Sequence, residues 1–138
     1  MVEFELGQNV TIYMFCYDKE TNKIKIYNLE YEVSFMDIKT TKYIDETKTI
    51  KEAATIDYTF YRPYYALIKD TDLNEFRNLD TPYYSLECND KIIEEYSKYV
   101  KNYFETRIEE NKDEINTLLD KNKHLEQIIE KIKVEKVE

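Results

Sequence analysis

The sequence predicts an α+β protein in which an antiparallel β-domain over residues 1–88 precedes a helical segment over residues 89–138. Two observations predict this division. Apolar and polar side chains alternate with the period of a β-strand in the first segment, whereas apolar side chains recur every three or four residues in the second. In addition, neither Pro nor Gly occurs after Pro82. We therefore expect a small sheet or barrel-like domain followed by a long helix or helical hairpin, with the pattern of a coiled coil.

The first predicted element is a strand over residues 10–17, where side chains alternate and both faces are apolar enough to be covered. The next five residues, 18–22, form a turn without glycine. Asn tolerates a left-handed backbone better than other non-glycine residues, so Asn22 is the predicted positive-φ position of a β-hairpin.

The returning strand begins at Lys23, and its alternation changes phase near Tyr27. Ile24 and Ile26 share one face, whereas the odd-numbered residues 27–35 share the other. Because one inserted residue shifts the phase of a strand, we predict a β-bulge or sharp bend near Tyr27–Asn28.

A polar stretch separates this strand from the next. Residues 37–48 are predicted to form a loop or a weak edge strand. The sequence Thr49-Ile-Lys-Glu52 matches a capping box, which predicts a short helical turn through Ala54.

Three further elements complete the predicted β-domain. Residues 56–60 alternate as a third strand, which Pro63 interrupts because proline donates no ladder hydrogen bond. A strand then resumes over residues 64–69, a short helix is predicted over residues 72–78, and a last strand over residues 84–88.

The C-terminal segment is predicted to be helical from Asn89 or Asp90, either of which can cap a helix. Asn122 would occupy an a position, where a buried Asn sets register and oligomer number. The segment could pair with another copy of the chain, fold back as a hairpin near residues 111–113, or lie across the sheet and then project. The predicted oligomerisation seam has heptad spacing and consists of Ile115, Leu118, Asn122, Leu125, Ile129 and Ile132.

Composition and charge exclude several classes of function. The net charge of −9 disfavours nonspecific binding to nucleic acids or anionic membranes. A single glycine excludes glycine-rich phosphate loops. The N-terminus lacks the features of a signal peptide, and Cys16 and Cys88 are expected to be reduced. We therefore expect a soluble, cytoplasmic protein.

The sequence offers little catalytic chemistry. Its one histidine, His124, lies on the predicted helix, and with two distant cysteines it cannot form a transition-metal site of the usual ligands within one chain. Paired acids such as Glu94-Glu95 are explained as solvated helix surface. We therefore expect no enzymatic activity, no catalytic residues, no metal and no cofactor.

Aromatic and basic residues gather in the second half of the β-domain, and this is the candidate binding surface. Three interpretations stay open: a tyrosine-rich core that reflects codon usage, a protein interface, or a pocket in which aromatic rings and arginine hold a nucleotide. The nucleotide pocket would use Arg62, Tyr64 and Tyr65, with Arg107 at a subunit junction. The candidate binding residues are Tyr58, Phe60, Tyr61, Arg62, Tyr64, Tyr65, Arg77, Tyr83, Tyr84 and Arg107.

A compact β-domain with a tyrosine-rich strand pair and a C-terminal helix rich in Glu, Lys and Ile resembles small accessory proteins of phages and mobile elements. This resemblance implies an antagonist of host defence, such as an anti-CRISPR inhibitor, that acts by binding. The leading hypothesis is thus a non-enzymatic homo-oligomer whose aromatic surface blocks a host protein. The alternatives are a sponge that sequesters a nucleotide second messenger and a structural coiled-coil protein.

Overall fold

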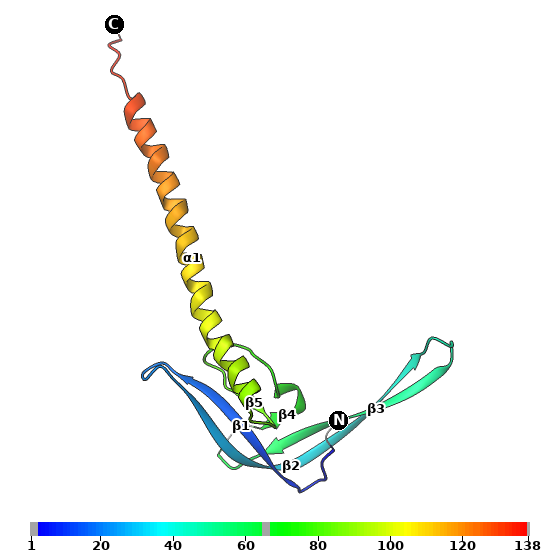
Figure 1. Cartoon of the computed structure of the whole chain (residues 1–138). Helices are drawn as coiled ribbons and strands as arrows, with labels where there is room; N and C mark the ends of the chain where they lie inside the picture. Colours follow the sequence, from blue (N-terminus) through cyan, green and yellow to red (C-terminus); the bar gives the residue numbers. More distant parts are fainter. Residues whose placement is uncertain (1–2, 65–66, 138) are drawn as a thin grey trace. The chain divides into compact units, whose positions relative to one another are not determined.

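The structure is a computed structural model that describes residues 3–64 and 67–137, and it confirms the predicted α+β class. An antiparallel sheet precedes a single long helix in the sequence (Figure 1). The elements are β1 (Asn9–Asp18), β2 (Lys23–Ile44), β3 (Ile50–Tyr61), β4 (Ile68–Lys69), β5 (Tyr83–Ser85) and α1 (Asp90–Lys131).

The sheet has the strand order β4-β3-β2-β1-β5, and β4 and β5 form its two edges. It is therefore an open sheet and not a barrel. The β1–β2 turn confirms the predicted role of Asn22, which has a φ of 57°. The Tyr17 hydroxyl donates a hydrogen bond of 2.7 Å to Asn22 Oδ1, which helps to hold this conformation.

β2 contains a register shift, but not at the position that the sequence predicted. β1 and β2 pair without interruption from Asp18 opposite Lys23 to Asn9 opposite Glu32, so the prediction near Tyr27–Asn28 is wrong. The register shifts instead between Val33 and Phe35, where β2 pairs with β3. The inserted residue changes which side chains face the core, because odd-numbered residues do so before the shift and even-numbered residues after it.

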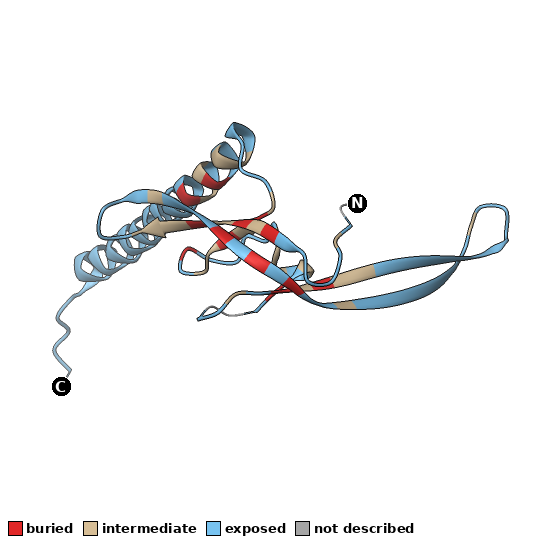
Figure 2. Ribbon diagram, turned by 90° about the horizontal axis from the view of Figure 1, so that it is seen from below, coloured by how far each residue is buried: buried red, intermediate tan, exposed pale blue. Residues whose placement is uncertain are grey.

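One face of the sheet carries the main hydrophobic core. Side chains of β1, β2, β3 and β4 interlock there, and Figure 2 shows the buried residues gathered in the middle of the sheet. The buried members of this core are Val10, Ile12, Leu29, Tyr31, Val33, Tyr58, Phe60 and Ile68.

Aromatic rings form a second core on the opposite face, where the start of α1 packs. Asn89 caps the helix as predicted, since its side-chain oxygen accepts a 3.0 Å hydrogen bond from the N–H of Ile92. Tyr96 contacts Phe15 of β1, and Phe76 stacks on Tyr83 with ring centroids 4.5 Å apart. The first turns of the helix are thus part of the β-domain.

Several predicted elements differ from the observed ones. Of the two alternatives for residues 37–48, the strand is correct for residues 37–44, which pair with β3, and residues 45–48 lie in the turn between the strands. The helical turn to Ala54 is wrong, because β3 continues through it as a paired strand. The short helix over 72–78 is also wrong, and a 3₁₀ turn at Asp70–Asp72 takes its place. Of the predicted strand 64–69 only β4 is formed among the described residues, and the last strand is shorter than predicted.

The chain divides into two compact units, Met1–Tyr99 and Val100–Glu138. The first unit ends beyond the predicted boundary at residue 88, because the first turns of α1 pack on the sheet. α1 continues unbroken to Lys131, so the predicted alternative of a hairpin near residues 111–113 is wrong.

Candidate interaction surfaces

The far ends of β2 and β3 form a two-stranded ribbon, which we call the arm (residues 37–57). Its register runs from Asp37 opposite Asp57 to Ile44 opposite Ile50. Figure 1 shows the arm extending beyond the other strands of the sheet. Within the described part of the chain, no further strand pairs with either edge of the arm. Both edges therefore present main-chain groups to a potential partner.

The arm continues the core-facing side of the sheet, and nearly all of its side chains are exposed there in the described part of the chain. Even-numbered arm residues lie on the same side as the buried Tyr58 and Phe60, because β-strand side chains alternate. Ile38, Ile44 and Ile50 are 65%, 71% and 70% exposed. We call this side the apolar face of the arm, and it consists of Ile38, Thr40, Lys42, Ile44, Ile50, Glu52, Ala54 and Ile56.

A hydrogen-bonded turn holds the tip of the arm. The Asp45 carboxylate accepts hydrogen bonds from the backbone N–H groups of Thr47 and Thr49 at 2.9 and 3.1 Å. It also lies 2.9 Å from Lys51 Nζ, and these contacts lower the pKa of Asp45 to about 2. Lys48 adopts a φ of 60° to close the turn. The tip is therefore an ordered structure and not a loose loop.

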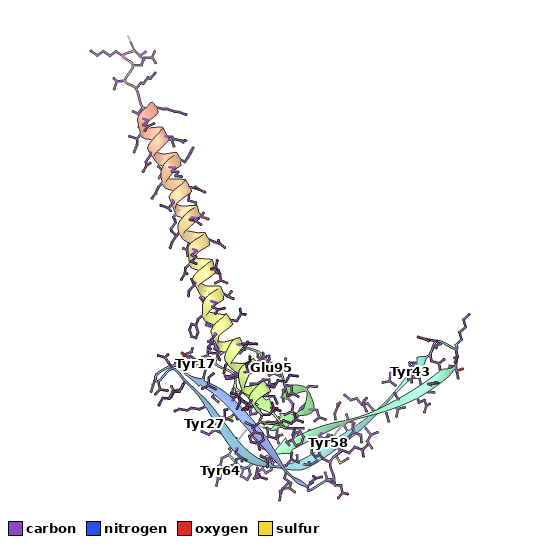
Figure 3. The ribbon with its side chains drawn as sticks, viewed as in Figure 1. Tyr17, Tyr27, Tyr43, Tyr58, Tyr64 and Glu95 are labelled. Carbon is purple, nitrogen blue, oxygen red and sulfur yellow. The ribbon has the colours of Figure 1, made fainter. Side chains whose placement is uncertain are left out.

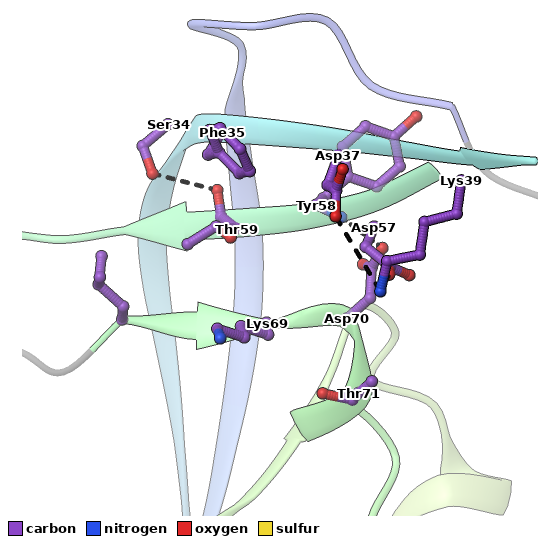
Figure 4. Close-up of a pocket in the computed structure, with 11 residues that line it drawn as sticks. Ser34, Phe35, Asp37, Lys39, Asp57, Tyr58, Thr59, Lys69, Asp70 and Thr71 are labelled. Atoms are coloured by element: carbon purple, nitrogen blue, oxygen red, sulfur yellow. Dashed lines mark hydrogen bonds and ion pairs between the residues drawn. The ribbon is translucent and has the colours of Figure 1, made fainter. Parts of the chain in front are cut away.

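The other side of the arm is polar at its base. Lys39 Nζ lies 3.0 Å from Asp57 and 4.0 Å from Asp37, and the hydrogen bond to Asp57 raises the pKa of Lys39. These residues border an open hollow of about 540 Å³ (Figure 4). Its lining residues are Ser34, Phe35, Asp37, Lys39, Asp57, Tyr58, Thr59, Leu67, Lys69, Asp70 and Thr71.

The chemistry of this hollow favours a structural role. The Asp70 carboxylate accepts a 2.7 Å hydrogen bond from the N–H of Tyr58, which ties the 3₁₀ turn to β3. Burial raises the pKa of Asp70. Three carboxylates face two lysines here, so the hollow has no excess positive charge for a phosphate. Among the described residues, no group of three His, Cys, Asp or Glu side chains is arranged to bind a metal.

The structure divides the predicted aromatic surface between core and exterior. Tyr58, Phe60 and Tyr83 are at most 5% exposed and belong to the core of the single chain, although Tyr58 also borders the hollow. Tyr84 is half-buried against the main core. In the single chain, the core interpretation therefore holds for Tyr58, Phe60 and Tyr83, and in part for Tyr84.

Two other predicted aromatic residues do lie on the surface. Tyr61, the last residue of β3, is 43% exposed. Tyr64 is fully exposed and has a φ of 67° (Figure 3). The prediction for Tyr65 falls outside the described residues.

The three arginines bind local groups. Arg62 Nη1 donates a 3.1 Å hydrogen bond to the backbone carbonyl of Glu30. Arg77 lies 2.7 Å from Asp72 and 3.1 Å from Glu75, and these hydrogen bonds raise its pKa. Arg107 belongs to the second unit, where its guanidinium lies 5.4 Å from the ring centroid of Tyr103. Of the predicted binding residues, Arg77 and Tyr84 lie together, since both line a pocket of about 200 Å³ in which Asp72 and Glu75 offset the charge of Arg77.

The predicted seam lies on an exposed stripe of α1 and the residue that follows it. Its apolar members, Ile115, Leu118, Leu125, Ile129 and Ile132, are all exposed, and so is Asn122. Leu119 and Ile128 flank the stripe, and Phe104 and Ile108 extend it toward the start of the helix. A stripe of this length on a helix is the pattern of an interface between helices.

The interpretation of the sequence missed the apolar face of the arm. Two isoleucine pairs, Ile38 with Ile56 and Ile44 with Ile50, were obscured by the Lys and Thr residues between them. The available signal was the density of β-branched and aromatic residues over 38–44, which is typical of a strand. The charged capping-box pattern after Thr49 favoured a helix instead.

Comparison of the chain with protein-family models, with curated proteins and with solved structures finds no match. Within the described residues, no helix is both long enough and apolar enough to cross a membrane. The function must therefore be inferred from the two exposed surfaces themselves.

Proposed function

We propose that this chain is a non-enzymatic binding protein that self-associates through its helix and binds a partner protein with the arm. The observation that carries the proposal is the apolar face of the arm, which continues the core side of the sheet beyond the core. This face carries two isoleucine pairs, which lie on either side of Thr40, Ala54 and the Lys42–Glu52 ion pair of 3.7 Å. Exposed apolar groups bordered by polar residues mark interaction sites on proteins. Ile38, Ile44 and Ile50 are the most exposed large apolar residues of this face.

The physical state of the arm supports this proposal. An isolated two-stranded ribbon is marginally stable in water, because each strand has only one neighbouring strand to bond its main-chain groups. A partner that covers the apolar face, or adds a strand to one edge, would bury the isoleucines and satisfy open main-chain groups. The ordered turn around Asp45 keeps the ribbon in the conformation that such a partner would bind.

The charge of the arm indicates the chemistry of the partner. Residues 37–57 contain four lysines and five acids, which is close to neutral. An arm for nucleic acids or anionic lipids would carry an excess of positive charge. The partner we propose is therefore a protein that presents an apolar patch or an open strand edge.

The class of this partner is proposed from the resemblance to phage and mobile-element accessory proteins. An accessory protein of this kind would block a component of host defence. The charge balance of the arm and its apolar isoleucines suit a protein target, and the local contacts of Arg62 and Arg77 give no support to nucleotide sequestration.

The experiment compares wild-type protein with the double variant Ile38→Thr/Ile50→Thr. Threonine keeps the preference for a strand and removes the exposed apolar groups. A partner is first identified by affinity purification from bacterial cells and is then purified, and its binding is measured by calorimetry. We expect the double variant to bind at least about tenfold more weakly, which corresponds to about 1.4 kcal/mol.

The matched control is Tyr43→Thr, which removes an exposed aromatic residue from the opposite face of the same strand. It should bind the partner as wild type does. Equal binding by the double variant, or equal losses in the double variant and the control, would contradict a docking role for the apolar face.

A structural or assembly role is a second candidate, and the uninterrupted helix favours it. α1 is 42 residues long. If assembly is the whole function, arm variants will leave the activity of the protein in cells unchanged, whereas Leu118→Lys and Leu125→Lys in the seam will abolish it.

A further inference from the structure

The residue pattern of α1 also indicates how many copies of the helix would associate and in which direction they would run. We propose that residues 104–132 of two copies form a parallel, in-register, two-stranded coiled coil in which Asn111 pairs with Asn111 and Asn122 with Asn122. This inference rests on the self-association in the proposed function, and it adds the number of chains and the direction of the helices.

The residue types at the core positions indicate two strands. With Ile115 at an a position, Ile108 and Ile129 are also a residues, and Leu118 and Leu125 are d residues. In parallel coiled coils, Ile at a with Leu at d favours dimers, since each side chain suits the packing angle of its layer. All five side chains are exposed in the single chain, so they are available to a second copy.

The two asparagines determine the direction. In a parallel, in-register pair each residue meets its own copy, so Asn122 meets Asn122 and the two amides can hydrogen-bond. In an antiparallel pair an a residue meets a d residue. Asn122 would then lie against Leu118 or Leu125, where a buried amide loses its hydrogen bonds.

One antiparallel register does pair Asn122 with Asn111, since Asn111 is a d residue. That register, however, places Glu105 of one helix beside Glu126 of the other along the flank of the interface. Like charges at such a distance repel each other. On its other flank this register pairs Glu114 with Lys121. The parallel arrangement replaces these pairs by contacts between Lys121 and Glu126, and it satisfies both asparagines without the repulsion between Glu105 and Glu126.

The flanking charges are compatible with the parallel register. Lys121 at a g position meets Glu126 at the e position of the other helix, which is an attractive pair. The same pairing of g and e positions brings Arg107 of one helix near Lys112 of the other. Each of these bases already has an acid on its own helix, because Arg107 lies 3.8 Å from Glu110 and Lys112 lies 3.3 Å from Glu109.

Leu119 and Ile128 also fit this register. Leu119 occupies an e position and Ile128 a g position, and both are exposed in the single chain. In the parallel pair Leu119 meets Glu114, and Ile128 lies near the end of the coil. The alkyl portion of Glu can cover an apolar side chain while its charged end stays in water.

The test is disulfide cross-linking of the full-length chain. Cys16 and Cys88 are free thiols, so both are first replaced by Ser, and Ile129→Cys is then introduced in this background. In the parallel register the two new cysteines face each other within disulfide range. We expect most of the protein to form a covalent dimer under mild oxidation, and a reductant should reverse it.

Gln127→Cys is the matched control. It occupies an f position on the outside of the coil, so it should stay uncrosslinked at the same concentration. Native mass spectrometry of the unoxidised proteins is run in parallel, and we expect a dimer in every variant.

The outcomes separate this inference from the proposed function. A dimer that fails to cross-link through Ile129→Cys, or cross-links equally through Gln127→Cys, overturns the parallel register but leaves self-association intact. A trimer or tetramer overturns the two-stranded form. A monomer at micromolar concentration contradicts self-association itself, and with it this inference.

Discussion

The ring of Phe15 on β1 packs against the ring of Tyr96 on α1, with centroids 5.5 Å apart. Phe15 is fully buried and Tyr96 is 1% exposed. This contact joins the first turns of the helix to the sheet face opposite the main core. It explains why the compact unit extends to Tyr99. Removing it tests directly how much the packing of the helix on the sheet contributes to stability.

Replacement of Tyr96 by alanine should destabilise the first unit by about 3 kcal/mol, because removal of a large buried aromatic side chain leaves a cavity. Urea unfolding followed by far-ultraviolet circular dichroism measures this change. Tyr103→Ala, which removes an exposed tyrosine of the same helix, should change stability by less than about 0.5 kcal/mol. Equal effects would show that the Phe15 contact contributes little.

Alkaline pH should destabilise the protein through Tyr96. Burial raises the pKa of its hydroxyl to about 12, whereas an unfolded tyrosine has a pKa near 10. Since the folded pKa is raised, the stabilisation is fully present below pH 10 and is lost as pH rises from 10 through 12. Denaturant melts across this range should show a steeper loss for wild type than for Tyr96→Phe.

Burial also raises the pKa values of Tyr83 and Tyr84, so part of the alkaline loss will persist in Tyr96→Phe. An identical pH dependence in wild type and variant would contradict a contribution from Tyr96.

The turn at the tip of the arm should respond to acid. Because the folded pKa of Asp45 is lowered to about 2, its stabilisation is present above the unfolded value near 3.8 and is lost as pH falls through 2. Hydrogen exchange should show protected amides at Thr47 and Thr49 at pH 5, with protection lost near pH 2. Asp45→Ala should already lack this protection at pH 5, while the amides of β1 exchange as in wild type.

Asn122 should limit the stability of the coiled coil. Replacement by isoleucine would remove the polar layer that the proposed interface contains, so we expect a higher melting temperature and a mixture of oligomer numbers. Thermal melts combined with native mass spectrometry measure both. The neighbouring change Lys123→Ile, at a position outside the seam, serves as a control. An unchanged melting temperature with an unchanged mass would contradict the placement of Asn122 in the interface.

Local patterns predicted some elements closely. The hairpin at Asn22 and the helix cap at Asn89 depend on a few adjacent residues, because turn and cap preferences arise from local backbone and side-chain geometry. The end of β3 before Pro63 has an equally local cause. The break between strand-like and helix-like periodicity identified the α+β class for the same reason.

The arm and the bulge could not be identified in this way. The sequence around Thr49 matches a helical capping box, yet it forms a strand because Ile50 pairs with Ile44 across the ribbon. Such pairing joins segments that are separated in sequence, and it overrides weak local preferences. The phase change at Ser34 likewise depends on the partner strand, since the β1–β2 ladder ends at Glu32 and the register shift belongs to the β2–β3 ladder.

The candidate surfaces show the same distinction. The sequence by itself determined the seam of α1, because a helix presents every third or fourth residue on one face whatever lies around it. It also determined the net charge of −9, which disfavours nucleic acid as a partner. Only the tertiary structure decided that Tyr58, Phe60 and Tyr83 belong to the core while Ile38, Ile44 and Ile50 lie exposed. All six are apolar or aromatic strand residues, and burial depends on which other elements cover each face of the sheet.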